Sequence, residues 1–192
     1  MQVLIEISAR HAHLSAGALE ALFGKGHELK KLKGLSQKGE FAAEEKVVLK
    51  TPKGELELRI IGPIRPATQV ELSATEARKL GLNPPVRLSG NIAGSEKGTL
   101  AGPAGEAALA EGIILAKRHI HISDIEAEEF GLANGQIVSV KVPGPRSLTF
   151  HDVEVRAKES FSFAMHIDTD EANAANVQTG VQGFIEGIQS EG

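Results

Sequence analysis

The sequence predicts a β-rich α+β protein built from two small β-barrels that arose by internal duplication, with short helices capping each barrel. The first observation is a repeated motif: residues 10–15 read Arg-His-Ala-His-Leu-Ser and residues 118–123 read Arg-His-Ile-His-Ile-Ser. The second is a later match, in the same order, between Glu71-Leu-Ser-Ala-Thr-Glu-Ala and His166-Ile-Asp-Thr-Asp-Glu-Ala. The third is a series of short apolar runs separated by Gly and Pro turns, which is typical of small barrels.

A glycine-rich segment over residues 90–112 divides the chain into two expected halves, 1–95 and 96–192. Its glycines lie at positions 90, 94, 98, 102, 105 and 112. Residues 98–103 and 113–117 read as strands that bound turns, so the segment is expected to be part of the fold rather than a featureless linker.

Short strands are expected in both halves. Residues 3–7 read as a strand, and residues 46–61 read as a hairpin that turns at Pro52-Lys53-Gly54. The second half repeats this plan after Gly135. Its strands are expected over residues 137–142, 147–150 and 153–156.

Four short helices are expected because four residues of the N-cap type precede helical segments. Ser73, Ser123 and Asp168 each have Glu three residues later, which is the capping-box pattern, whereas Ser15 has none. Each helix is expected to end near a glycine, since glycine adopts the left-handed conformation of a helix stop. These glycines are Gly24, Gly81, Gly131 and Gly180.

Composition excludes several classes of protein. The net charge of −4 gives no support for nucleic-acid binding, and no apolar run approaches the ~20 residues that span a membrane. The absence of cysteine excludes a disulfide scaffold, a cysteine nucleophile and a thiolate metal site. Phe is the only aromatic residue, so stacking platforms for single strands or sugars are not expected.

Two His-x-His pairs, His11 with His13 and His119 with His121, are candidate metal ligands. In a strand, residues i and i+2 point to the same face, so each pair can chelate one zinc ion. The alternative to metal binding is that such histidines are simply exposed on the surface of a strand. Duplication of the pair, each time between an Arg and a cap residue, favours metal binding.

The internal match supplies a third ligand for each pair, Glu71 in the first half and His166 in the second. Three protein ligands leave the fourth zinc position open, as in catalytic sites. Four of these candidates lie two residues before an expected helix cap: His13, Glu71, His121 and His166. Each is therefore expected where a strand meets a helix N-terminus, which attracts anions. His27 and His151 lack these contexts, and we interpret both as surface histidines.

Arg65 lies between Pro63 and Pro66, which stiffen the backbone around it. An immobilised guanidinium suits phosphate, although a surface Arg in a turn fits the same pattern. The sequence has no Walker-type phosphate loop and no nucleophile elbow, so covalent acyl-enzyme chemistry has no visible nucleophile.

Five segments together resemble the PduL-type phosphate acyltransferases, the phosphate propanoyltransferases, over essentially the whole chain. They are Ser8-Ala-Arg-His-Ala-His-Leu-Ser, Leu35-Ser-Gln-Lys-Gly-Glu-Phe-Ala, Gly62-Pro-Ile-Arg-Pro-Ala-Thr-Gln-Val-Glu-Leu-Ser, Ala116-Lys-Arg-His-Ile-His-Ile-Ser and Met165-His-Ile-Asp-Thr-Asp-Glu-Ala-Asn. The resemblance implies conversion of acyl-CoA and phosphate to acyl phosphate and CoA, in either direction, with propanoyl-CoA or acetyl-CoA as substrate. It also implies two β-barrels with a dinuclear zinc site between them, and a homodimer.

The resemblance assigns the site residues. It implies that His11, His13 and Glu71 hold one zinc ion and that His119, His121 and His166 hold the second. It implies that Arg65 engages phosphate. It implies contacts to coenzyme A from four further residues: Ser8, Lys33, Arg59 and Asn173. In the loop that the family uses for coenzyme contacts, Gln37 is kept, but Glu40 stands where an uncharged polar residue is expected.

Two other functions remain open at this point. One is a dinuclear zinc hydrolase acting on thioesters or phosphoesters, in which metal-bound hydroxide attacks. The other is a non-catalytic metal-binding module, although three ligands per set argue against a purely structural zinc. The first strand is expected from residue 2, with no N-terminal encapsulation extension of the kind that the resemblance associates with bacterial microcompartments. We therefore expect a cytoplasmic enzyme with no membrane and no nucleic-acid partner.

Overall fold

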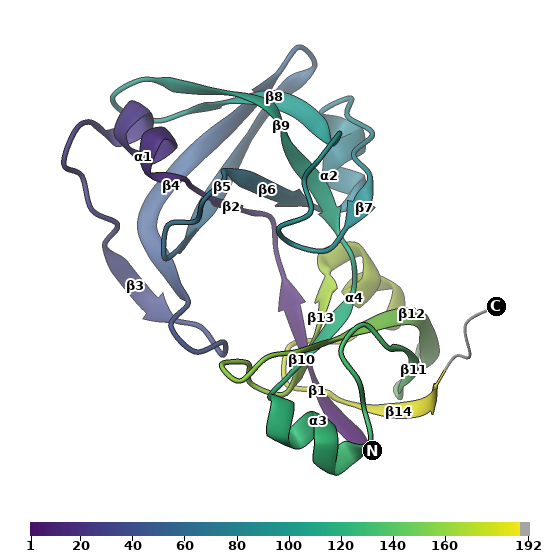
Figure 1. The fold of residues 1–192 in the computed structure, drawn as a ribbon. Coiled ribbons are helices and arrows are strands. Elements are labelled where there is room, and N and C mark those ends of the chain that lie inside the picture. The colour runs from purple at the N-terminus through teal and green to yellow at the C-terminus, as the bar shows by residue number, and fades with distance from the viewer. Residues whose placement is uncertain (189–192) are drawn as a thin grey trace. The chain divides into compact units, whose positions relative to one another are not determined.

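The computed structural model describes residues 1–188 and divides into two compact units (Figure 1). One unit consists of Met1–Ala9 together with the described residues from Lys117 onward, and the other consists of Arg10–Ala116. Each unit is a closed β-barrel with short helices, which confirms the predicted β-rich class. No helix among the described residues has both the length and the apolar character needed to cross a membrane.

The unit formed by Met1–Ala9 and the described residues from Lys117 onward is a barrel of six strands that closes on itself. In spatial order these are β1 (Gln2–Ser8), β13 (Ala164–Asp168), β10 (His119–Ile122), β12 (Leu148–Ala157), β11 (Ile137–Val142) and β14 (Gln182–Ile188). Its helices are α3 (Asp124–Phe130) and α4 (Thr169–Ala175). Buried side chains fill the barrel, including Ile5, Ile120, Val138, Val155 and Met165, because alternate residues of each strand point inward.

The unit formed by Arg10–Ala116 closes through a second ring of six strands. In order these are β4 (Phe41–Thr51), β5 (Gly54–Gly62), β2 (His11–His13), β6 (Gln69–Leu72), β9 (Glu106–Ala116) and β8 (Glu96–Ala101), which returns to β4. β3 (Lys31–Gly34) extends from β4, and β7 (Val86–Arg87) extends from β9. Its helices are α1 (Ala16–Phe23) and α2 (Ala74–Lys79).

The two barrels have equivalent strand pairing. β2 runs parallel to β5 and antiparallel to β6, just as β10 runs parallel to β12 and antiparallel to β13. β6 then pairs in parallel with β9, and β13 pairs in parallel with β1. β9 is therefore the counterpart of β1, as expected for a duplicated unit.

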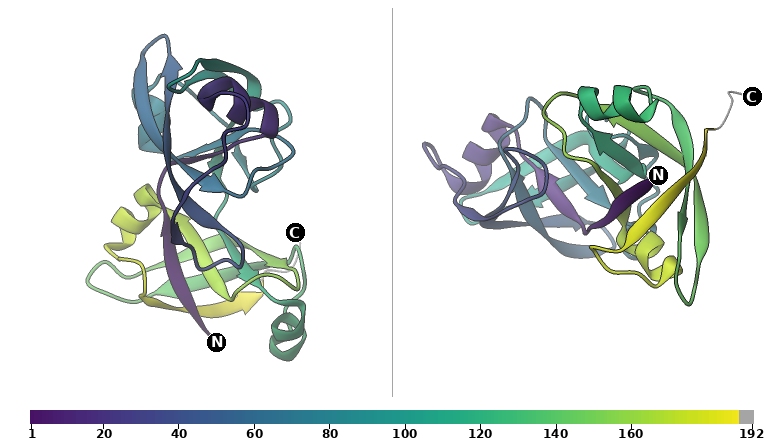
Figure 2. Two further views of the ribbon diagram at one scale, coloured as in Figure 1. Left: turned by 90° about the vertical axis from the view of Figure 1, so that its left-hand side faces the viewer. Right: turned by 90° about the horizontal axis from the view of Figure 1, so that it is seen from below.

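This equivalence means that the first strand of each repeat pairs in the other unit. β1 precedes the first His-x-His strand but pairs with β13 and β14, and it lies among the green and yellow strands in Figures 1 and 2. β9 precedes the second His-x-His strand but pairs with β6 and β8. The compact units therefore differ in extent from the expected halves 1–95 and 96–192, because each repeat contributes its first strand to the other barrel.

The helix starts follow the sequence pattern. Ser15, Ser73, Ser123 and Asp168 are the N-caps, and the last three form complete capping boxes. One helix end differs from the expectation: α4 ends at Ala175 with Asn176 in the left-handed conformation, rather than at Gly180. Asn tolerates that conformation through local hydrogen bonding of its short side chain, so the helix stops a turn earlier than the glycine would allow.

A second difference concerns the expected strands 147–150 and 153–156, which form one continuous strand, β12. Asp152, between them, has a positive φ of 54°. The pairing register of β12 with β11 shifts between Val138 and Val140. A local irregularity therefore bends the strand without ending it.

Candidate functional site

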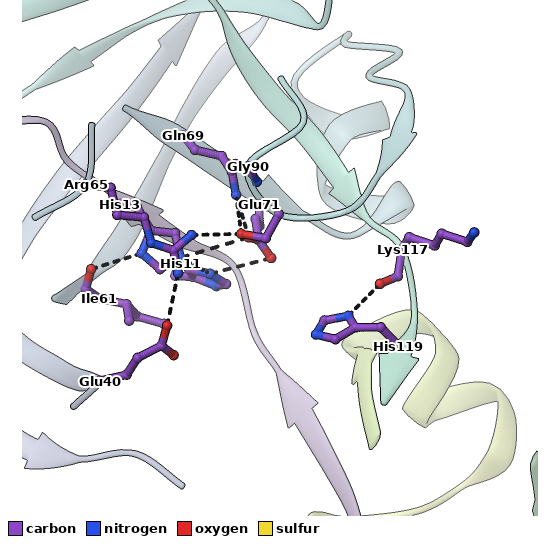
Figure 3. Close-up of polar contacts among 11 residues, drawn as sticks. His11, His13, Glu40, Ile61, Arg65, Gln69, Glu71, Gly90, Lys117 and His119 are labelled. Carbon is purple, nitrogen blue, oxygen red and sulfur yellow. Dashed lines mark hydrogen bonds and ion pairs between the residues drawn. The ribbon is translucent and has the colours of Figure 1, made fainter. Parts of the chain in front are cut away.

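The first candidate metal triad joins β2 to β6. His11 lies directly opposite Glu71 in the antiparallel pair, and His13 is two residues further along the same strand. The His11 and His13 Nε2 atoms are 3.2 Å apart, and the nearest Glu71 oxygens lie 3.6 Å and 3.9 Å from them, respectively. All three side chains are buried (Figure 3). The i, i+2 spacing thus places both imidazoles on one face, as predicted.

Hydrogen bonding orients the His13 ring. Its Nδ1 lies 3.1 Å from the Ile61 carbonyl oxygen, so Nδ1 is the protonated nitrogen and Nε2 turns its lone pair toward His11 and Glu71. Burial lowers the pKa of His13 to about 3, with further lowering from His11 and Arg65. The imidazole is therefore neutral near pH 7, which is the form that binds a metal ion.

The Glu71 carboxylate is ionised. Burial raises its pKa, but the neighbouring His11 and His13 outweigh burial and hold the pKa well below the usual range. A buried carboxylate that faces two imidazoles places negative charge and the His13 nitrogen lone pair in one small volume.

The second triad joins β10 to β13. His119 lies opposite His166, and the ring centroids of His119, His121 and His166 are 4.5–5.1 Å apart. His119 Nδ1 lies 2.8 Å from the Lys117 carbonyl oxygen, so Nδ1 is the protonated nitrogen and Nε2 carries the ring's lone pair (Figure 3). Phe161 stacks on His121 with a centroid distance of 3.9 Å.

Both triads fit a divalent metal ion. In each set the three ligand atoms all lie within 4.8 Å of one another. Imidazole nitrogens with or without one carboxylate are the ligands that zinc prefers where cysteine is absent. Three protein ligands per ion leave one position for a substrate or water. The residues that the sequence assigned to each ligand set are thus brought together within one unit.

Arg65 belongs to the same unit as the first triad, in the loop between β5 and β6. Its backbone N–H donates to the Leu14 carbonyl at 2.8 Å. Its Nη1 donates to Ser89 Oγ at 2.8 Å, and its Nη2 donates to Glu40 Oε1 at 3.0 Å. The guanidinium is therefore fixed at the backbone and at both terminal nitrogens.

Sequence reasoning missed two residues that connect Arg65 to the first triad. Gln69 Nε2 donates to Glu71 Oε1 at 2.6 Å and to Ser89 Oγ at 2.9 Å, while its Oε1 accepts from the Gly90 N–H at 2.7 Å (Figure 3). Gln69 is only 2% exposed. Its position two residues before Glu71 places it on the ligand face of β6, which was the available signal. Ser89 comes from a distant loop and left no signal in the sequence.

The expected coenzyme contacts occupy both units. Ser8 ends β1 and Asn173 lies on α4, where it lines a pocket of about 490 Å³ with Asn176 and Gln178. Lys33 lies exposed on β3, and Arg59 on β5 donates from Nη1 to the Ala43 and Glu44 carbonyls. Their role in binding coenzyme A stays a prediction.

The two remaining histidines differ from each other. His151 is exposed, as expected, and contacts Ser139. His27 keeps part of its side chain at the surface, with 28% of it exposed, while its ring stacks on Phe23 and lies 2.9 Å from Glu45. An apolar ring neighbour from α1 and a carboxylate from β4 therefore cover part of this histidine.

A family model described as phosphate propanoyltransferase matches residues 4–178. A protein of Lachnoclostridium phytofermentans named phosphate propanoyltransferase is 51% identical over 180 residues, covering 93% of this chain and 84% of its own. A protein of the same name from Thermotoga maritima is 47% identical, with coverage of 93% and 86%. Another from Shewanella putrefaciens is 51% identical over 176 residues, with coverage of 91% and 83%. The resemblance inferred from the motifs is thereby confirmed.

Proposed function

The chain belongs to the phosphate propanoyltransferase family, and from this premise we propose that it transfers a short acyl group between coenzyme A and phosphate. Membership makes it a phosphate acyltransferase. The proposed reaction converts acyl-CoA and phosphate to acyl phosphate and CoA, reversibly, with propanoyl-CoA or acetyl-CoA as substrate. The observation that carries the proposal is an immobilised arginine joined by hydrogen bonds to a buried His-His-Glu triad.

We propose that the triads hold two zinc ions per chain, one in each. His11, His13 and Glu71 would bind the first ion, and His119, His121 and His166 would bind the second. When bound, zinc supplies Lewis-acid stabilisation of negative charge on oxygen or sulfur. The neutral His13 and the ionised Glu71 require no loss of protons before metal binding near pH 7.

The proposed chemistry needs no protein nucleophile. A phosphate oxygen forms a bond to the thioester carbonyl carbon, the carbon–sulfur bond breaks, and CoA leaves as the thiolate. The Arg65 guanidinium would bind the phosphate dianion and hold it for attack, which removes much of the entropic cost of bringing the reactants together. Ser89 and the buried Gln69 would keep that guanidinium in one position.

Coenzyme A would be contacted by Ser8, Lys33, Arg59 and Asn173. Lys33 and Arg59 are cations and suit phosphate groups, whereas Ser8 and Asn173 offer neutral hydrogen-bonding groups. The homodimer implied by the family resemblance also remains a proposal.

Thiol release from propanoyl-CoA or acetyl-CoA tests this function. We expect release that depends on phosphate, is lost after chelation and returns with zinc. Acyl phosphate should form in equal amount, which hydroxylamine trapping can measure. Release that ignores phosphate would indicate a thioester hydrolase instead. No release by folded, metal-loaded protein would favour the non-catalytic metal-binding module.

A further inference from the structure

We propose that Glu40 is a built-in competitor for phosphate: its carboxylate occupies Arg65 until a phosphate dianion displaces it, and it thereby raises the phosphate concentration needed to occupy Arg65. This inference rests on the proposed function of Arg65 as the phosphate-binding residue. Glu40 and Arg65 belong to the same unit, and their contact of 3.0 Å joins the loop before β4 to the loop before β6 (Figure 3).

The loop backbone holds Glu40 in place. The Leu35 N–H donates to the Glu40 carbonyl at 3.0 Å, and the Glu40 N–H donates to the Gln37 carbonyl at 3.1 Å. Gln37 is itself buried. The carboxylate therefore stands on a closed turn that aims it at Arg65, rather than on a free surface loop.

The two terminal nitrogens of Arg65 have different partners. Nη1 is held by the neutral Ser89 hydroxyl, which is fixed in turn by Gln69, and Gln69 accepts from the Gly90 backbone. Nη2 donates to the charged Glu40 carboxylate. The side chains of Arg65 and Glu40 are 29% and 32% exposed, so solutes can reach this ion pair. The Ser89 contact thus holds the guanidinium in place, whereas the Glu40 carboxylate can be replaced by an incoming anion.

Charge decides that Glu40 competes with phosphate rather than helping to bind it. Two anions on one guanidinium repel each other, and the nearby Glu71 carboxylate adds to the negative charge of this region. The position of Arg65 does not need Glu40, because the backbone contact to Leu14 and the Ser89 hydroxyl already hold the residue. A carboxylate at this position therefore lowers the affinity for every incoming anion.

The same competition acts on every anion that binds Arg65. The Glu40 carboxylate must leave before any of them binds, so it lowers the affinities for chloride, formate and phosphate by the same factor. A phosphate dianion still binds more strongly than a monoanion because it gains more Coulomb energy at the guanidinium. Glu40 would thus set the phosphate concentration at which Arg65 becomes occupied.

The variant Glu40→Gln tests this inference because it keeps the shape and the hydrogen-bond acceptor but removes the charge. We expect the KM for phosphate to fall about three- to tenfold, the scale of a partly exposed ion pair. The KM for acyl-CoA should change less than the KM for phosphate. Inhibition by chloride and formate should become stronger than in the wild-type protein. Glu40→Ala should give the same directions if the charge is the cause.

The matched control is Glu106→Gln, which breaks the Lys50–Glu106 ion pair of 2.9 Å in the same unit without touching Arg65. The control should leave the phosphate KM and the chloride inhibition unchanged. An unchanged or higher phosphate KM in both Glu40 variants would overturn the inference. That result would leave the proposed reaction intact, because phosphate-dependent acyl transfer by the wild-type protein tests the reaction separately.

Binding without turnover separates this inference from the proposed reaction. The rise in melting temperature caused by inorganic phosphate should reach half its maximum at a lower phosphate concentration in Glu40→Gln than in wild type. If wild type transfers no acyl group but this shift is seen, the reaction is wrong and the anion competition stands. If wild type transfers acyl groups and this shift is absent, the competition is wrong and the reaction stands.

Discussion

Arg10 Nη1 donates to Glu76 Oε1 at 2.8 Å and thereby joins the residue before the first His-x-His strand to the first turn of α2. The second unit repeats this contact, since Arg118 Nη1 donates to Glu171 Oε1 at 2.8 Å in the first turn of α4. In both, the arginine precedes the first metal-ligand candidate, and the glutamate follows the third by five residues.

Each of these glutamates also completes its capping box. Glu76 accepts from the Ser73 N–H with its other oxygen, as Glu171 accepts from the Asp168 N–H. The arginine binds this glutamate, and the glutamate binds the cap residue at the end of the strand carrying the third ligand. Each Arg–Glu pair therefore adds a side-chain connection between the two paired strands that carry its triad.

We predict that Arg10→Gln weakens metal binding at the first triad only, and that Arg118→Gln weakens it at the second only. The expected loss is about tenfold in affinity, as is typical for residues that position metal ligands. Titration with Co²⁺ against a competing chelator can follow the two sites, and each variant is the control for the other. Equal metal affinity of both variants and wild type would show that these arginines serve packing alone.

Replacing Arg65 with Ala should lower kcat/KM for phosphate by about two orders of magnitude, the scale of losing a positioned charge at a reacting group. Metal content should stay at the wild-type value, because Arg65 is not in either triad. Steady-state kinetics with varied phosphate and metal analysis of the same sample check both expectations. Wild-type phosphate kinetics in this variant would remove Arg65 from the proposed mechanism.

The buried Gln69 should matter for stability as well as for activity. Gln69→Leu leaves Ser89 and Glu71 without their amide donor and the Gly90 N–H without its acceptor. Loss of such buried partners costs about 1–3 kcal/mol, which urea unfolding can measure. We also expect a higher phosphate KM, because Ser89 would no longer be fixed beneath Arg65. The half-buried Gln136, whose side chain accepts from the Ala133 N–H, offers a control substitution that is remote in sequence.

The metal-free protein should lose stability as the pH falls from 6.5 toward 3. Burial lowers the pKa of His13 from 6.5 to about 3 in the folded protein, so between these values the unfolded chain binds more protons. The free energy of unfolding therefore rises with pH across this interval and is full above it. The lowered pKa of Glu71 acts in the same direction below pH 4.5.

Urea unfolding at several pH values after chelation measures this dependence. His13→Gln should flatten the slope between pH 4 and 6.5, whereas His151→Gln, at an exposed position outside both triads, should leave it unchanged. An identical slope in His13→Gln and wild type would contradict the assigned burial of a neutral imidazole.

The ligands could be predicted from sequence because they obey local rules. His11 and His13 share a strand face through the i, i+2 spacing, and the internal repeat identified Glu71 and His166 as their distant counterparts. The cap residues that follow the ligands also have local signatures. The Gln69–Ser89 contact and the Glu40–Arg65 ion pair depend on which loops meet across the barrel, and no local pattern records that.

The exchange of β1 and β9 between barrels was also beyond sequence reasoning. Each strand reads correctly as a strand, but its pairing partner lies far along the chain, and a duplicated sequence offers two equivalent partners. Nothing in the residues of β1 distinguishes pairing with β13 from pairing with the equivalent β6. The folded structure shows which partner each strand takes: β1 pairs with β13, and β9 pairs with β6.

The strand exchange yields a final prediction about fragments. Residues 10–116 contain all six strands of one barrel together with His11, His13 and Glu71, so this fragment should fold and bind one metal ion. Residues 1–95 carry the same ligands but lack β8 and β9, so β4 and β6 would have unpaired edges. The core side chains that pack with Ile113 in the whole protein would also be exposed. This second fragment should be unfolded or aggregated in circular dichroism and size-exclusion experiments. A cooperative unfolding transition for 1–95, with none for 10–116, would instead place the folding boundary in the glycine-rich segment.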